Sequence, residues 1–126
     1  MTADLCEAVR YEVRYKLPDE NGETRLARNA RFGVESPEQS IPRFGMHLWE
    51  WFFDANELRR DHDKPLSASD WKAWQELTGV IVRLDEWRIL RKMDQVYVAG
   101  IIQEKTEAVQ RRIEANQNGG HCGTRV

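Results

Sequence analysis

The segment Ser67–Tyr97, SASDWKAWQELTGVIVRLDEWRILRKMDQVY, determines most of the fold that we expect for this chain. Ser67 precedes Asp70 by three residues, the pattern of a capping box, so a helix is predicted over 68–78. Its apolar face carries Trp71, Trp74, Leu77 and Thr78. Gly79 is predicted to end the helix, because a helix C-terminus commonly needs a residue that can adopt a positive φ.

Two further helices are predicted on either side of this one. After a short apolar bridge at 80–82, apolar residues recur at spacings of three and four, which predicts a helix over 85–114. Its last part is a thin apolar stripe among charges, which indicates an exposed stretch formed by Ile102, Val109 and Ile113. Before the segment, apolar side chains surround most of a helix predicted over 46–60, and Pro65 separates that helix from the next.

The N-terminal region has a different pattern. In Val9–Leu17, VRYEVRYKL, apolar and charged residues alternate, which predicts a half-buried strand. Pro18–Gly22 supplies turn residues, so a β-hairpin is expected. Its second arm, Glu23–Phe32, fits a strand and a short helix about equally well, and the sequence leaves both open. We therefore expect a mainly α fold, a small bundle of about three helices with an N-terminal β-hairpin.

Length and composition define the class of protein that we expect. The chain has 126 residues, a formal net charge of -2 and two cysteines near opposite ends, which suits one domain without a disulfide scaffold. No signal peptide or membrane span is expected, and the small net charge makes a mainly electrostatic nucleic-acid binder improbable. The expected organisation is an N-terminal extension over 1–32, a linker over 33–45, a helical domain over 46–115 and a disordered tail over 116–126.

We expect neither catalysis nor a bound cofactor or metal. The sequence Asp61, His62, Asp63 resembles a set of metal ligands, but three neighbouring side chains seldom converge on one ion, which favours a solvated loop. Cys122 lies beside His121 in a glycine-rich tail that would hold neither in place for nucleophilic chemistry. No glycine-rich phosphate loop is present.

The aromatic residues are the most informative feature for function. All five tryptophans lie between residues 49 and 87. A core role is preferred for most of them, but Trp49 and Trp51 lie about 200° apart on a helix, so one of them is expected at a surface or groove. Exposed aromatic residues are typical of protein-binding hot spots. The candidate partner-contact residues are Leu48, Trp49, Trp51, Phe52, Phe53, Trp71, Trp74, Trp87 and Tyr97.

The order of motifs from Glu35 to Tyr97 resembles that of the small tail assembly chaperones of long-tailed bacteriophages. The matching residues are Leu48, Trp49, Trp51, Phe52, Pro65, Leu66, Trp74, Leu77, Thr78, Gly79, Glu86, Leu90, Met93, Asp94 and Tyr97. The resemblance covers about half the chain, and it departs from the family at His47, where an aromatic residue is usual, and in Val9–Leu17, which has no counterpart. It implies a non-catalytic protein of the host cytoplasm that binds the helical tape-measure protein, or another tail component, during assembly.

A second hypothesis belongs to a different class. A small phage or bacterial regulator could bind a protein or a nucleic acid through the basic side of the N-terminal hairpin, with Arg10, Arg14 and Lys16 as its contacts. The sequence leaves the oligomeric state open, and a homo-oligomer is compatible with both hypotheses.

Overall fold

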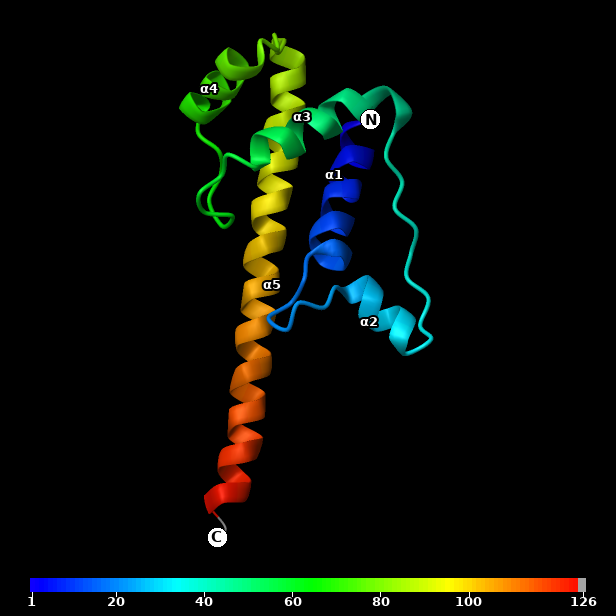
Figure 1. The fold of residues 1–126 in the computed structure, drawn as a ribbon, viewed down its shortest axis with the longest axis vertical. Coiled ribbons are helices and arrows are strands. Elements are labelled where there is room, and N and C mark those ends of the chain that lie inside the picture. Colours follow the sequence, from blue (N-terminus) through cyan, green and yellow to red (C-terminus); the bar gives the residue numbers. More distant parts are fainter. Residues whose placement is uncertain (125–126) are drawn as a thin grey trace.

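The computed structural model describes the backbone of residues 1–124 and the side chains of residues 1–117. Its helical elements follow one another along the chain (Figure 1). They are α1 (Thr2–Tyr11), the π-helical turn η1 (Glu12–Lys16), α2 (Arg25–Arg31), the short 3-10 turn η2 (Arg43–Gly45), α3 (Met46–Asn56), α4 (Ala68–Thr78) and α5 (Leu84–Thr124). The described residues contain five α-helices and no strand, so the mainly α fold is confirmed and the count of about three helices is wrong.

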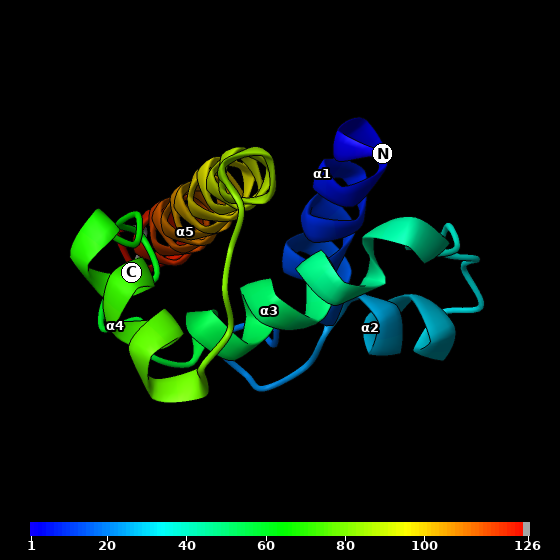
Figure 2. The same cartoon turned by 90° about the horizontal axis from the view of Figure 1, so that it is seen from above.

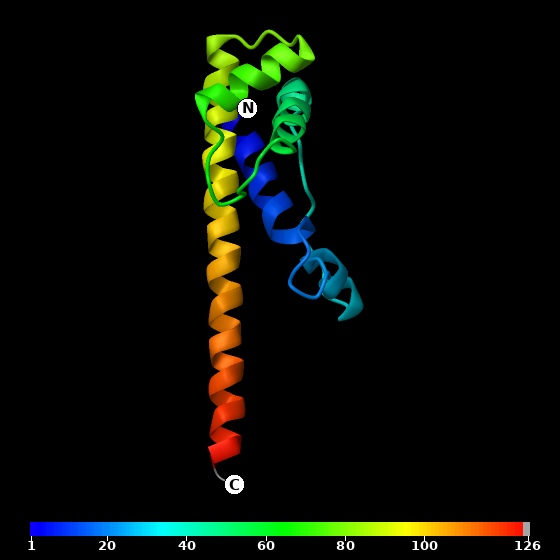
Figure 3. The same cartoon turned by 60° about the vertical axis from the view of Figure 1, so that its left-hand side comes forward.

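The long helix α5 is the scaffold on which the other elements lie. Helix α1 runs beside its N-terminal half, α3 crosses next to α1, and α4 lies close to the start of α5 (Figures 1 and 3). Seen from above, α3 passes in front of α1 and links the side of α2 to the side of α4 (Figure 2). The C-terminal part of α5 extends beyond all the other helices (Figure 1).

The central prediction, a helix over 68–78, is confirmed in its details. Helix α4 occupies this range, and the Ser67 hydroxyl accepts a hydrogen bond from the Asp70 N–H at 3.1 Å. In return, the Asp70 carboxylate accepts one from the Ser67 N–H at 2.9 Å, which completes the capping box. Gly79 ends the helix with a φ of 74°.

The other two predicted helices are present with different limits. Helix α3 ends at Asn56, earlier than the expected residue 60, and α5 begins at Leu84. The exposed stripe is confirmed, because Ile102, Val109 and Ile113 are all exposed. Helix α5 is described to Thr124, whereas a disordered tail was expected over 116–126; the side chains from residue 118 and all of residues 125–126 lie outside the described part.

The predicted N-terminal β-hairpin is wrong. The stretch Val9–Leu17 is helical, in α1 and η1, and the only ladder contact in this region is an isolated bridge between Pro18 and Thr24. Residues four apart share a face in both a strand and a helix, so the alternation within 9–17 could not distinguish the two. Leu5 extends the spacing of four upstream, and burial of this face against α5 favours the helix.

The second arm, which the sequence left open, is the helix α2. Thr24 is its N-cap, and its hydroxyl accepts a hydrogen bond from the Ala27 N–H at 3.1 Å. The following residues, 34–42, have no regular structure, as expected for a connector. The Gln39 amide holds this connector to the first helix by donating to the Ala8 carbonyl at 3.1 Å and to the Glu12 carboxylate at 2.9 Å.

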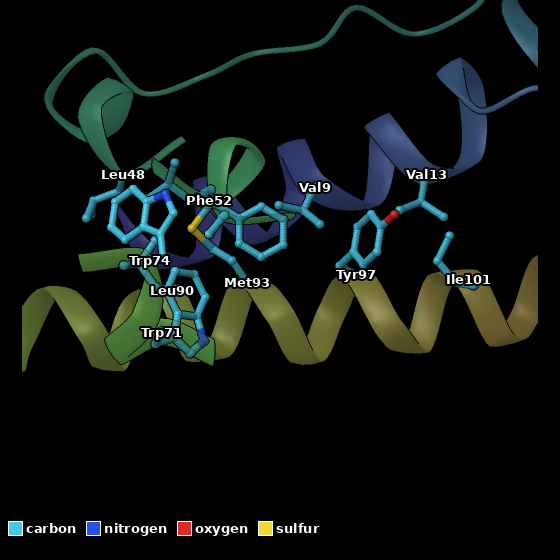
Figure 4. Packing of buried hydrophobic residues seen from close by; sticks show 12 residues of the cluster. Val9, Val13, Leu48, Phe52, Trp71, Trp74, Leu90, Met93, Tyr97 and Ile101 are labelled. Atoms are coloured by element: carbon cyan, nitrogen blue, oxygen red, sulfur yellow. The ribbon is translucent and has the colours of Figure 1, made fainter. Parts of the chain in front are cut away.

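One hydrophobic core joins the N-terminal region to the rest of the molecule. Side chains of α1 and α5 point toward one another, with α3 and α4 closing the end of the layer (Figure 4). Gly100 permits close contact in this layer, because a Cβ there would lie 3.0 Å from Cγ1 of Val13. The expected extension over 1–32 therefore contributes Leu5, Val9 and Val13 to the same core as the helical domain.

Candidate protein-binding surface

The nine predicted contact residues divide into two groups by burial. Five of them are buried in the core, with at most 3% of their surface exposed: Leu48, Phe52, Trp71, Trp74 and Tyr97. The other four are half-buried at its margin: Trp49, Trp51, Phe53 and Trp87. Most of the predicted site is therefore the hydrophobic core, which a partner cannot reach in this conformation.

The half-buried aromatic residues do not form one surface. Trp49 packs against Phe53 on one side of α3, with ring centroids 4.6 Å apart. Trp51 lies on the other side of α3, near the buried Trp74 at 6.2 Å. Trp87 lies on α5, where the Arg91 guanidinium is 5.5 Å from its ring. The four rings therefore face different parts of the surface.

The polar residues of the α5 motif hold neighbouring loops in place. The Asp94 carboxylate is buried, and it forms an ion pair with Arg59, which is also buried. Its second oxygen accepts a hydrogen bond from the Leu66 N–H at 3.0 Å. Arg59 also donates to the Asn56 side chain at 2.7 Å and to the Lys64 carbonyl at 2.6 Å. This network fixes the loop between α3 and α4 on α5, a role that sequence analysis missed.

The two ends of the same motif act in a similar way. The Tyr97 hydroxyl lies 2.6 Å from Nδ1 of His62, which holds the loop that contains the metal-like Asp-His-Asp sequence. Glu86 accepts a hydrogen bond from the Arg83 N–H at 3.1 Å, which lowers the pKa of Glu86, and its other oxygen lies 2.9 Å from the His47 ring. The motif resemblance therefore rests largely on residues with structural roles.

Three large aliphatic side chains remain exposed where α4 joins α5. The exposed fractions of Leu77, Ile81 and Leu84 are 76%, 84% and 62%, and we call this set the α4–α5 edge. The expectation that Leu77 shares the apolar face of Trp74 is wrong, because the helix ends at Thr78 and leaves this side chain beyond the core. The apolar run at 80–82, outside any predicted helix, was the signal for this edge in the sequence.

The basic residues of the second hypothesis are neutralised by neighbouring carboxylates. Arg10 pairs with Glu7, Arg14 with Glu104 at 3.2 Å, and Lys16 with Glu12 at 3.6 Å. With the hairpin absent as well, nothing in this arrangement favours a basic recognition face.

Other candidate chemistry is limited in the part of the chain that the structure describes. Among these residues, no group of three or more histidine, cysteine or acidic side chains is arranged to hold a metal ion. Burial raises the pKa of the Cys6 thiol, which favours its unreactive protonated form, while the side chain of Cys122 lies outside the described residues. No described helix has the combination of length and apolar character needed to cross a bilayer.

Comparison of the chain with protein-family models, with curated proteins and with solved structures gives no match.

Proposed function

We propose that this protein is a non-catalytic tail assembly chaperone of a long-tailed phage, which binds apolar helical segments of the tape-measure protein in the host cytoplasm. The observation that carries the proposal is the α4–α5 edge, where three large aliphatic side chains between residues 77 and 84 have most of their surface exposed. Exposed apolar groups gathered in this way mark sites of protein association.

The position of Leu77 links this edge to the motif resemblance. In the segment AWQELTG, Trp74 is buried and Gly79 has the positive φ of a helix end, so both have structural roles. Leu77 has no such role, because 76% of its surface is exposed. A motif residue that the fold does not need is the residue expected to serve a partner.

The physical character of the edge suits reversible binding to a helix. A tape-measure chain before assembly would expose long apolar seams that aggregate unless they are covered. Covering a large aliphatic side chain contributes about 1.5–3 kcal/mol, and association costs offset much of the sum from three of them. The result is a contact strong enough to shield a seam and weak enough to be released.

Co-expression with the tape-measure protein from the same genome tests the proposal. The triple variant Leu77→Ser, Ile81→Ser, Leu84→Ser is expected to leave that protein insoluble and to lose co-purification with it. A matched control replaces three exposed apolar residues elsewhere, Phe32, Val34 and Phe44, which have 67%, 55% and 86% of their surface exposed.

The control variant and the wild type are expected to keep the tape-measure protein in solution to the same extent. Circular dichroism would establish that both triple variants retain their helices. Failure of the wild-type protein to co-purify with its partner would overturn the proposed function. Equal loss with the two triple variants would show that the α4–α5 edge is not the binding surface.

A further inference from the structure

A cavity of about 520 Å³ lies far from the α4–α5 edge, between three segments of the chain. One wall is the turn Pro18–Gly22 with α2, the second is the loop at 60–63, and the third is the part of α5 from Ile101 to Arg111. Leu84 and Glu104 are roughly 30 Å apart along α5 at 1.5 Å per residue. The cavity is within the size range of ligand sites in proteins.

The floor of the cavity is apolar and its rim is open to water. Val13 and Ile101 are core residues that contribute to the lining, together with the half-exposed Leu17 and with Ala108. Around them, rim residues such as Arg14 and Glu20 are exposed. An open trough of this kind suits a side chain carried on a polypeptide better than a fully enclosed small molecule.

Most charged groups of the lining neutralise one another. Glu104 pairs with both Arg14 and Arg25, at 3.2 and 3.3 Å. Asp63 pairs with Lys105 at 3.5 Å. These acidic groups are therefore already occupied, and they do not provide a site for a cation.

The remaining acidic groups are occupied as well. Glu20 lies 3.9 Å from Arg111, Glu23 pairs with Arg31 at 2.8 Å, and Asp61 lies 3.7 Å from Lys64. Asp19 accepts hydrogen bonds from two backbone N–H groups of its own turn, which lowers its pKa.

Two arginines of the lining have no such partner. Arg28, on α2, and Arg60, in the loop after α3, have no carboxylate within ion-pair distance among the described residues. They belong to different walls, so the cavity combines two available guanidinium groups with an apolar floor. Guanidinium groups form strong, directed hydrogen bonds with carboxylates.

We propose that this cavity binds an acidic peptide segment of a partner protein. Carboxylates of that segment are held by Arg28 and Arg60, while an aliphatic side chain next to them lies on Val13, Leu17 and Ile101. The inference rests on charge complementarity within the cavity, and it does not depend on the partner being a tape-measure protein.

Fluorescence anisotropy with a labelled peptide of defined sequence tests the proposal. The probe is the acetylated and amidated twelve-residue peptide (Glu-Leu-Glu-Gln)₃, and its control is (Lys-Leu-Lys-Gln)₃. The glutamate peptide is expected to bind the wild-type protein, and the lysine peptide is not. Replacing both available arginines, Arg28→Gln and Arg60→Gln, is expected to weaken binding of the glutamate peptide at least tenfold.

A matched double variant separates this site from a general effect of charge. Arg88→Gln with Arg112→Gln removes two exposed arginines of α5 that are outside the cavity lining, and it is expected to leave binding within twofold of the wild type. Equal weakening by the two double variants, or no binding to the wild type, would overturn the proposal. So would arginine-dependent binding of dodecanoate, a free amphipathic carboxylate, without binding of the peptide. None of these results bears on co-purification through the α4–α5 edge.

Discussion

Replacing Asp94 by Asn tests whether the buried network on α5 holds the loop between α3 and α4. The side chains of Asp94 and Arg59 have about 3% and 2% of their surface exposed. The substitution keeps the shape of the residue and removes its charge, so the Arg59 guanidinium loses its counter-ion in a buried site. It also weakens the acceptor for the Leu66 N–H.

The expected loss can be worked out from these contacts. Removing one partner of a buried ion pair typically costs about 3–5 kcal/mol, because the other charge remains buried and uncompensated. Arg59 keeps its bonds to the Asn56 side chain and the Lys64 carbonyl and its position 4.8 Å from the Tyr97 ring centroid, which favours the lower half of that range. A domain of this size has about 5–15 kcal/mol of stability in total, so the loss is a large fraction.

Urea unfolding, followed by tryptophan fluorescence, measures this change in the free energy of unfolding. Asp85→Asn is the control, because Asp85 also lies on α5 but 72% of its side chain is exposed. We expect the control to change stability by less than about 0.5 kcal/mol. A loss below about 1 kcal/mol for Asp94→Asn would refute the argument that this carboxylate compensates a buried charge.

Three further predictions concern the core, a helix contact and the capping box. Trp74→Ala is expected to cost about 3–5 kcal/mol in thermal melting, and Trp51→Ala less than half as much, since Trp51 is only half-buried. Gly100→Leu should cost about 1–3 kcal/mol in urea unfolding by overpacking against Val13, and a variant as stable as the wild type would contradict that close contact. Hydrogen bonds from the capping box lower the pKa of Asp70, so its stabilising contribution is present above the unfolded-state pKa of about 3.9 and is lost as the pH falls through the lower folded-state value. Asp70→Asn should therefore show a smaller loss of stability than the wild type between about pH 5 and 3 in urea titrations, and an equal loss would count against the capping box as its source.

The parts of the fold that could be predicted from sequence are those with local signals. The capping box at Ser67 and the positive φ of Gly79 depend on residues close together in the chain, and both are present. The strand prediction for Val9–Leu17 failed because side chains four apart are on one face in either structure. Only the position of α5, a long-range feature, decides between them.

The candidate site was less accessible to sequence analysis than the fold. Aromatic residues indicated a surface, yet burial assigned Trp71 and Trp74 to the core, since a small helical domain needs its largest rings for its interior. Leu77 had the spacing of a core residue, and its exposure follows from where α4 ends. The pairing of Arg59 with Asp94 joins residues 35 positions apart, for which a single sequence has no signal.

The π-helical turn η1 matters for how the chain could change in length. A π-helical turn bonds each residue to the fifth one along, so it contains one more residue than an α-helical turn. Losing one residue from Glu12–Lys16 would convert the segment to a regular helix and rotate everything after it by about 100°. The turn at Pro18–Gly22 would then swing away from α5 and dismantle one wall of the arginine-lined cavity. Related chains with a single deletion here should thus keep the core but lack that recess.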